Sequence, residues 1–251
     1  MEWNDEGVVI SVRRHGEMAW VVDLLTAEHG RHAGFIHGKN KNRERNGLQL
    51  GNQVDARWRS RLIEQLGTYN CELIKARSAI LFHDPIRLIA MSSVCGMCYL
   101  GISERVPCRD VFDGVIRFLD ALEQGKQWYS LYVTWELELL SQLGFGLDLK
   151  SCAITGRTDN LSYVSPRTGR AATSEAAKPY CDRLMPLPKF MVDREISSPA
   201  FKDILQGLTI TGHFLERNLM QPQGRKFPRA RLRLIEIMSS VNPESESVSS
   251  K

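Results

Sequence analysis

Gln53-Val-Asp-Ala-Arg-Trp-Arg-Ser-Arg-Leu62 alternates polar and apolar residues, which is the pattern of a β-strand with one buried face. The alternation predicts that Trp58 lies on the buried face. It also predicts that Arg57, Arg59 and Arg61 share the opposite, solvent-facing side. The fold that contains this strand therefore combines an apolar interior with a row of guanidinium groups outside.

Further short runs of β-branched and aromatic residues surround this stretch, with Gly-containing turns between them. Besides residues 53–62, strands are predicted at residues 7–13, 18–25, 31–37 and 68–74. Strands at this spacing predict a small β-barrel, for which the OB barrel is the natural candidate, although a five-stranded SH3-like barrel fits the same pattern. Trp20 and Phe35 are expected in the core rather than as platforms for stacked bases.

The apolar period becomes that of a helix after residue 84. Asp84-Pro85 predicts a helix start, with Asp as the cap and Pro in the first turn. Gly144-Phe-Gly146 predicts a helix end. A turn at Ser165–Gly169 predicts a short hairpin between residues 161–164 and 170–173. Helices are predicted at residues 86–103, 109–123, 128–143, 198–208, 211–220 and 228–240.

The predicted fold class is α+β: an N-terminal OB-type β-barrel is followed by a helical domain with a small β-hairpin insertion. We expect an OB domain at residues 1–80 and a helical C-terminal domain at residues 81–241. Within the helical domain, residues 147–190 are expected to form an irregular hairpin segment. Residues 242–251 are rich in Ser and Glu, so a disordered tail is expected there.

The strongest functional signal is a basic stretch within the barrel region. Between residues 31 and 61, eight Lys and Arg residues stand against Glu44 and Asp55, and eight minus two gives a local charge near +6, whereas the whole chain carries +4. A sheet face with a basic loop suits the tracking of a phosphate backbone, although a solvated strand face explains the charge equally well. The predicted DNA-binding residues are Arg31, Lys39, Lys41, Arg43, Arg45, Arg57, Arg59 and Arg61.

A second basic cluster lies near the end of the chain, where Arg229 and Arg233 are expected to share a helix face. Such a face suits phosphate or the acidic tail of a partner protein, but a solvated helix surface is the simpler explanation. The cluster comprises Arg217, Arg225, Lys226, Arg229, Arg231 and Arg233.

The composition predicts a soluble globular protein of the cytosol. Apolar residues make up 43% and charged residues 25%, as in ordinary globular domains rather than disordered chains. No apolar run approaches the roughly 18–20 residues of a membrane span. The start, Met1–Glu6, is acidic where a secretory signal is basic and apolar. The six cysteines are therefore expected to be reduced thiols.

Neither the cysteines nor the histidines predict a metal site. Cys95-Gly-Met-Cys98 has no second pair at a suitable distance and lies in an apolar helix, where such thiols usually pack. Cys152 and Cys181 bracket the hairpin, but two ligands do not make a four-coordinate zinc site. Histidines without ligand spacing are interpreted as surface or hydrogen-bonded residues: His15, His29, His32, His37 and His213.

No catalytic motif is found in the sequence. The patterns G-x-x-x-x-G-K-[ST], G-x-G-x-x-G, H-E-x-x-H and G-x-S-x-G are absent. Gly144-Phe-Gly146 follows a helix rather than a strand, so a helix end explains it. We therefore expect a binding protein rather than an enzyme, with no catalytic residues and no cofactor.

Three stretches, taken together in their order and spacing, resemble bacterial RecO proteins, particularly those of the proteobacterial branch. The likeness covers roughly residues 4 to 240. The stretches are His15-Gly-Glu17 through Leu25-Thr-Ala-Glu-His-Gly-Arg-His32, then Glu136-Leu-Glu-Leu-Leu-Ser-Gln-Leu-Gly-Phe-Gly-Leu-Asp-Leu149 with Cys152-Ala-Ile-Thr-Gly156, and then Tyr163-Val-Ser-Pro-Arg-Thr-Gly-Arg170 with Leu184-Met-Pro-Leu-Pro188.

The resemblance implies an N-terminal OB domain and a helical C-terminal domain. It also implies binding to single- and double-stranded DNA, annealing of complementary strands, and help in loading the RecA recombinase onto strands coated by single-stranded-DNA-binding protein. The implied partners are DNA, RecR and the acidic C-terminal tail of that coating protein, with no membrane partner. The implied location is the cytoplasm, in association with the nucleoid.

One departure from the family concerns zinc. Many RecO relatives carry a four-cysteine zinc motif in the region of residues 152–181. Here Cys152 is kept, Thr155 stands at the next ligand position, and only Cys181 lies near the missing second pair. We therefore expect no bound zinc.

Two other functions fit a basic barrel. One is an OB-type RNA-binding or ribosome-associated factor. The other is an uncharacterised enzyme with a cleft between barrel and helices, which needs a convergent cluster of titratable residues. A titration with single-stranded DNA, duplex DNA and RNA across a salt series separates the DNA-binding and RNA-binding hypotheses.

Overall fold

The computed structural model describes residues 1–240 except residues 18, 38–46, 63–64, 126, 194–195 and 197. The disordered tail predicted at residues 242–251 lies outside the described part of the chain. The strands are β1 (Glu2–His15), β2 (Ala19–Thr26), β3 (Gly30–His37), β4 (Gln53–Arg59), β5 (Thr68–Lys75), β6 (Leu161–Val164), β7 (Ala171–Thr173) and β8 (Met185–Pro186). The longer helices are α3 (Pro85–Gly101), α4 (Arg109–Gln124), α5 (Trp128–Gln142), α7 (Phe201–Leu215) and α8 (Arg229–Ser240). Short helical turns are α2 (Arg77–Ile80), α6 (Ser174–Ala177), η1 (Lys178–Arg183), η2 (Lys189–Met191), η3 (Glu216–Met220) and η4 (Gln221–Gln223).

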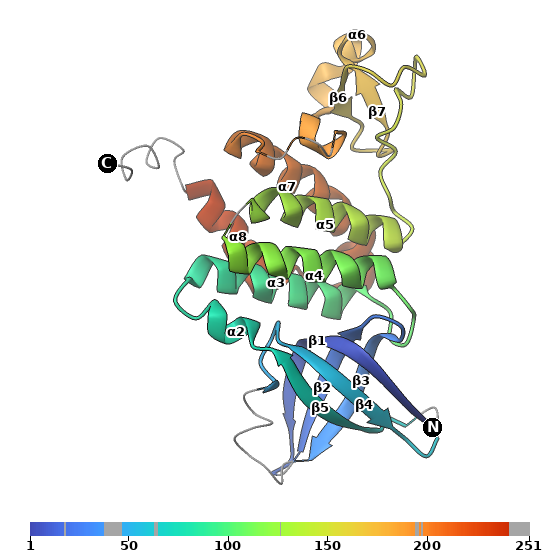
Figure 1. The fold of residues 1–251 in the computed structure, drawn as a ribbon. Coiled ribbons are helices and arrows are strands. Elements are labelled where there is room, and N and C mark those ends of the chain that lie inside the picture. Colours follow the sequence, from blue (N-terminus) through green and yellow to red (C-terminus); the bar gives the residue numbers. More distant parts are fainter. Residues whose placement is uncertain are drawn as a thin grey trace, which may run out of the picture. The chain divides into compact units, whose positions relative to one another are not determined.

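The first five strands close into a barrel in the order β1–β2–β3–β5–β4. All neighbours pair antiparallel except β3 and β5, which run parallel where Phe35 meets Thr68. This is the predicted OB-type barrel, visible as the blue-to-teal strands of Figure 1. The mixed α+β fold class is thereby confirmed.

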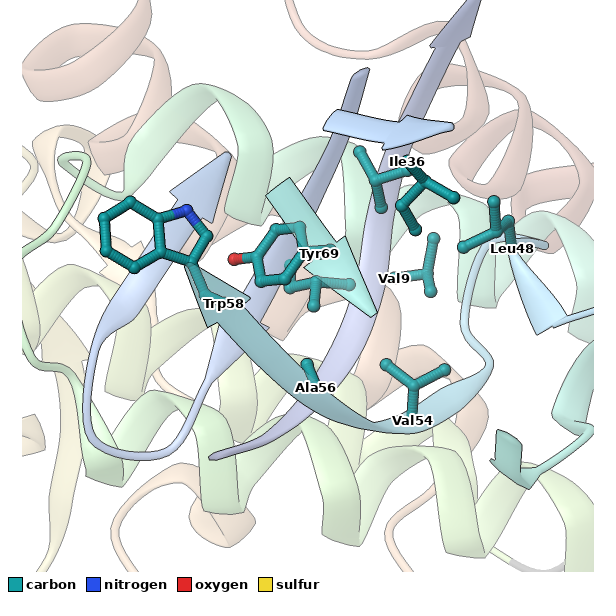
Figure 2. Packing of buried hydrophobic residues seen from close by; sticks show 9 residues of the cluster. Val9, Ile36, Leu48, Val54, Ala56, Trp58 and Tyr69 are labelled. Carbon is teal, nitrogen blue, oxygen red and sulfur yellow. The ribbon is translucent and has the colours of Figure 1, made fainter. Parts of the chain in front are cut away.

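The barrel core has an aliphatic part and an aromatic part. Val9, Ile36 and Val54 are at most 4% exposed, and they fill one part of the barrel (Figure 2). Trp58 of β4 and Tyr69 of β5 are ladder partners and are also buried. Trp58 therefore lies in the core, as the alternation predicts. Trp20 and Phe35 are only half-buried, and Trp20 packs against this same cluster.

Two glycines make room for the buried rings. At Gly34, a Cβ atom would lie 2.5 Å from the ring of Tyr69. At Gly67, whose φ of +68° is left-handed, a Cβ atom would lie 2.5 Å from the indole of Trp58. Any larger side chain at either position would displace the aromatic ring.

The chain packs as two compact units, which we describe separately. The first comprises Met1–Gln124 and Pro228–Leu234, and in it α3 contacts β1 while α4 contacts β2. Asp84 caps α3 by accepting a hydrogen bond from the backbone N–H of Arg87 at 3.1 Å, and Pro85 begins the helix, both as predicted. The division into an OB domain at residues 1–80 and a helical domain at residues 81–241 remains a prediction from the sequence.

The second unit, Gly125–Phe227 with the chain from Ile235, pairs α5 with α7. Gly144, with a φ of +82°, follows the end of α5 and confirms the predicted stop. The predicted hairpin is present as β6 and β7, and β8 adds an unpredicted third strand beside β6.

The two helices predicted at 198–208 and 211–220 are one helix instead. Helix α7 runs through the supposed break and continues into the wider turn of η3. The segment between the two predicted helices contains β-branched residues, which a helix accommodates less readily. Thr209 fits in the helix because its hydroxyl donates to the carbonyl of Leu205 at 2.9 Å, and the hydroxyl of Thr211 donates to the buried carboxylate of Glu136 at 2.5 Å. Across the described part of the chain, no helix is long and apolar enough to cross a membrane.

Candidate nucleic-acid interface

The outer face of β4 presents the arginines that the alternation predicts. Trp58 points inward, whereas the side chains of Arg57 and Arg59 are 61% and 75% exposed. The strand ends at Arg59, so the predicted end at Leu62 is wrong. The chain turns there because the hydroxyl of Ser60 donates to the carbonyl of Leu62 at 2.8 Å. Arg61 lies just beyond the strand and is also exposed.

Glu2, at the start of β1, neutralises part of this basic surface. Its carboxylate forms an ion pair with Arg57 and lies 3.5 Å from Nε of Arg59. In the β1–β4 ladder Glu2 stands directly opposite Arg59, so the two side chains emerge on the same face. One carboxylate, that of Glu2, therefore lies close to both exposed guanidinium groups and neutralises part of their charge.

The same sheet face becomes acidic further along β4. Asp55 stands opposite Glu6 of β1 and opposite Glu72 of β5. These partners lie outside residues 31–61, so the local charge near +6 did not include them. The basic character of the β4 face is therefore limited to its Arg57 and Arg59 end.

The other predicted DNA-binding residues fall into two groups. Those in the loop before β4 lie outside the described residues, and their placement stays a prediction: Lys39, Lys41, Arg43 and Arg45. Arg31 is described, and its side chain is only 18% exposed. It donates to the carbonyl of Ile102 at 2.9 Å, lies 3.5 Å from Asp23, and stacks its guanidinium 5.3 Å from the ring of Tyr99. Arg31 thus joins β3 to the end of α3, apart from the arginine pair on β4.

The second basic cluster does not form one exposed face. Arg231 is only 2% exposed, and Arg217 donates to the backbone carbonyls of Pro166 and Arg167, both at 2.9 Å, where it supports the hairpin turn. Arg229 and Arg233 are exposed on α8, in agreement with their predicted common face.

The hairpin segment does not fit the four-cysteine zinc motif. Burial opposes ionisation of Cys152, but hydrogen bonds from the Thr155 side chain and from backbone N–H groups, including that of Thr173 at 3.4 Å, lower the pKa of its thiol to about 6. Cys181 is exposed, and its thiol lies 3.7 Å from Asp182. Within the ranges that the structure describes, no three His, Cys, Asp or Glu side chains gather in a way that holds a metal.

An aromatic cluster beside Trp58 was missed by the sequence analysis. Trp3 stacks on His29 with ring centroids 4.1 Å apart, and His32 packs its edge against Trp3 at 5.0 Å. The prediction began the first strand at Gly7, whereas β1 begins at Glu2. Trp3 is the single apolar residue between Glu2 and Glu6, so no alternation marks this part of the strand in the sequence.

Comparison with known proteins identifies the family. The model "Recombination protein O N terminal" matches residues 1–77, and "Recombination protein O C terminal" matches residues 82–226. A protein of Rhodospirillum centenum named DNA repair protein RecO is 49% identical over 238 residues, which is 94% of each chain. A protein of the same name from Dinoroseobacter shibae is 42% identical over 241 residues, covering 95% of this chain and 98% of the relative. The chain therefore belongs to the RecO family.

Proposed function

We propose that this protein is a recombination mediator that binds single- and double-stranded DNA, anneals complementary strands and helps to load RecA onto DNA coated by single-stranded-DNA-binding protein. Membership of the RecO family supports a role in DNA repair and recombination. In this role the protein binds without catalysing a reaction, and it works in the cytoplasm at the nucleoid.

The observation that carries DNA binding is the arginine pair on the outer face of β4. Arg57 and Arg59 are two residues apart on a strand that is hydrogen-bonded on both sides, so their guanidinium groups are held on one rigid face. The sequence adds Arg61 and the four basic residues of the loop that precedes β4. Such a surface recognises the phosphate backbone without reading bases.

Salt-dependent titration tests this proposal. Replacing Arg57, Arg59 and Arg61 with Ala should weaken binding to all sequences alike and flatten the plot of log affinity against log salt. The slope should fall by about 0.7–0.9 for each lost phosphate contact. The matched control replaces three exposed arginines outside both basic clusters, Arg117, Arg167 and Arg183, with Ala. An unchanged slope in the β4 variant, or an equal change in the control, would reject the assigned surface.

The same titration with RNA separates the alternative function. A DNA mediator should bind single-stranded DNA and duplex DNA and accelerate annealing of complementary DNA strands. An OB-type RNA-binding factor should prefer RNA because its site recognises the 2′-hydroxyl. Preference for RNA, together with no effect on DNA annealing, would favour that alternative.

The proposed protein partners are RecR and the C-terminal tail of single-stranded-DNA-binding protein. An acidic tail with an apolar end needs an apolar groove for its last side chains and a cation for its terminal carboxylate. A synthetic tail peptide should therefore bind the full chain and lose affinity when its terminal apolar residue is removed. Binding that ignores this residue would indicate bulk charge attraction instead. Co-migration with purified RecR tests the other partner.

A further inference from the structure

A cavity of about 490 Å³ lies in the first compact unit beside the arginine pair. The start of β1, the turn between β2 and β3, the end of β4 and the connection from α3 to α4 all contribute to its wall. Trp3, His29, His32 and Trp58 supply aromatic rings. The charged side chains of the wall are Glu2, Arg105 and Glu28, the last of which forms an ion pair with Arg109. Its volume falls within the range of small-molecule sites, about 300–1,000 Å³.

The aromatic wall is a preformed stack. Trp3 is nearly parallel to both of its neighbours: its ring centroid is 4.1 Å from that of His29 and 5.7 Å from that of Trp58. His32 meets Trp3 and Trp58 edge-on at 5.0 and 4.8 Å. Trp58 and His32 are buried, so a further planar ring can reach the half-buried rings of Trp3 and His29, which the buried rings support from behind.

Hydrogen bonds fix these rings in place. The indole N–H of Trp58 donates to the carbonyl of Leu66 at 3.0 Å, and Nδ1 of His29 lies 3.0 Å from the carboxylate of Asp5. Because the rings are already ordered, a ligand that stacks on them does not have to order them when it binds.

The charged groups of the wall match the edge of a nucleobase. Glu2 supplies carboxylate oxygens, which accept hydrogen bonds from N–H groups of bases, either amino groups or the ring N–H of thymine. Arg105 supplies a guanidinium, which donates to base acceptors, and one of its nitrogens already donates to the carbonyl of Gln65 at 2.9 Å. An aromatic wall with both an acceptor and a donor suits a flat heterocycle better than a purely apolar side chain.

Glu2 connects this cavity to the phosphate-binding surface. It lines the cavity and also pairs with Arg57 and Arg59, while Trp58 stands between these arginines on β4 with its ring turned inward. We propose that the cavity binds an unpaired nucleobase of single-stranded DNA whose neighbouring phosphates lie on Arg57 and Arg59. This inference rests on the proposed DNA-binding function and adds a base-stacking site to it.

The first test removes the bases and leaves the protein unchanged. Oligothymidine and a fully abasic deoxyribose-phosphate strand of equal length carry the same backbone charge. The wild-type protein should bind oligothymidine more tightly, by roughly 5- to 150-fold, which corresponds to about 1–3 kcal/mol for one stacked base. Equal affinity for the two strands would overturn the proposal, whereas no binding to any DNA would overturn the proposed function itself.

The second test removes the stacking surface. Trp3→Ala should reduce the preference for oligothymidine over the abasic strand to near unity, while Trp3→Phe should retain most of it. Binding to blunt duplex DNA, whose bases are paired, should not change. Trp20→Ala is the matched control, because Trp20 is also a half-buried tryptophan of the barrel but does not line the cavity. An equal loss in the Trp20 variant, or a parallel loss of duplex binding, would overturn the assignment.

Discussion

Glu2 forms an ion pair with Arg57 across neighbouring strands of the barrel. Arg57 is one of the residues proposed to hold DNA phosphates, so the carboxylate occupies a position at which a phosphate would compete. DNA binding must therefore break this exposed ion pair before the guanidinium is available. Exposed pairs contribute little, with a median of about 0–1 kcal/mol, so the competition is weak enough for a phosphate to win.

The first prediction follows from this competition. Glu2→Gln keeps the size of the side chain but removes its charge, and it should raise the affinity for DNA by roughly two- to fivefold at low salt. The gain should shrink as salt rises, because salt screens the carboxylate. Fluorescence anisotropy with a labelled oligonucleotide measures the change.

Glu72→Gln is the control for this prediction. Glu72 lies on the same sheet face and loses the same charge, but its ladder partner is Asp55 rather than an arginine. Its effect on DNA affinity should be clearly smaller. Equal gains in the two variants would mean that net charge alone acts, and that the pairing with Arg57 has no specific part.

The alternation in residues 53–62 was enough to predict the direction of Trp58, Arg57 and Arg59, because a strand's side chains must alternate between its faces. The barrel followed from strand spacing and turn glycines. The acidic neighbours could not be predicted in the same way. Strand pairing places Glu2 and Glu72 on the same sheet face as the arginines. The register of that pairing depends on contacts between residues far apart in the sequence, so it could not be predicted from the alternation alone.

The aromatic cavity escaped prediction for a related reason. Trp3 and His29 are 26 positions apart in the sequence and meet only when β1 pairs with β2. Arg31 illustrates the opposite error: counted as a free charge, it is engaged by Asp23, Ile102 and Tyr99. Charge counts along a chain do not distinguish a cation that packs from one that is free.

The second prediction concerns pH and His32. Burial, and next the nearby Arg105, lower the pKa of His32 to about 4 from the ordinary 6.5. Because the folded pKa is the lower one, protons bind preferentially to the unfolded chain. The contribution of His32 to stability is complete above pH 6.5 and is lost as the pH falls towards 4. At pH 5 the loss should be about 2 kcal/mol.

Denaturant unfolding at pH 7.5 and pH 5 measures this loss. His32→Phe cannot ionise but keeps a flat ring against Trp3 and Trp58, so its free energy of unfolding should fall less between the two pH values. Comparing the two pH-dependent changes removes the cost of the lost hydrogen bond with Tyr69, since that cost is present at both pH values. Parallel pH profiles for the wild type and the variant would contradict the assignment to His32.

The third prediction concerns Arg77, which is 1% exposed and joins α2 to α4. Its guanidinium lies 2.8 Å from Asp120 and 2.6 Å from Glu123, and this pairing helps to lower the pKa of Asp120 against the opposing effect of burial. Arg77→Met should reduce the free energy of unfolding by about 3 kcal/mol, because it removes the buried cation and leaves the two carboxylates only the more exposed Lys75.

Lys75 provides the comparison, because it contacts the same two carboxylates from a more exposed position, at 3.1 and 2.7 Å. Lys75→Met should cost less than about 1 kcal/mol, as expected for an exposed pair. Chemical denaturation of the two variants gives both values. Similar losses would show that burial of Arg77 has no particular importance.

The last prediction is that the hairpin segment holds no zinc. A structural zinc site uses four ligands, and the Cys152 thiolate is instead stabilised by hydrogen bonds from Thr155 and from backbone N–H groups. N–H donors cannot bind a cation. A zinc ion would have to displace these hydrogen bonds in order to bind the Cys152 thiolate. Protein purified without a tag and supplied with zinc should contain far less than one zinc per chain by elemental analysis, and EDTA should leave its melting temperature unchanged.

A positive control makes this measurement decisive. A RecO relative that carries the complete four-cysteine motif should bind zinc and lose thermal stability when EDTA is added, because metal binding there contributes to folding.

The stability of the present hairpin should depend on pH instead. Since hydrogen bonding lowers the pKa of Cys152 to about 6, its thiolate stabilises the fold fully above the unfolded value near 9, and this contribution is lost as the pH falls through 6. Cys152→Ala should remove that dependence. A content of about one zinc per chain, released together with a fall in melting temperature, would contradict the prediction that the hairpin segment holds no zinc.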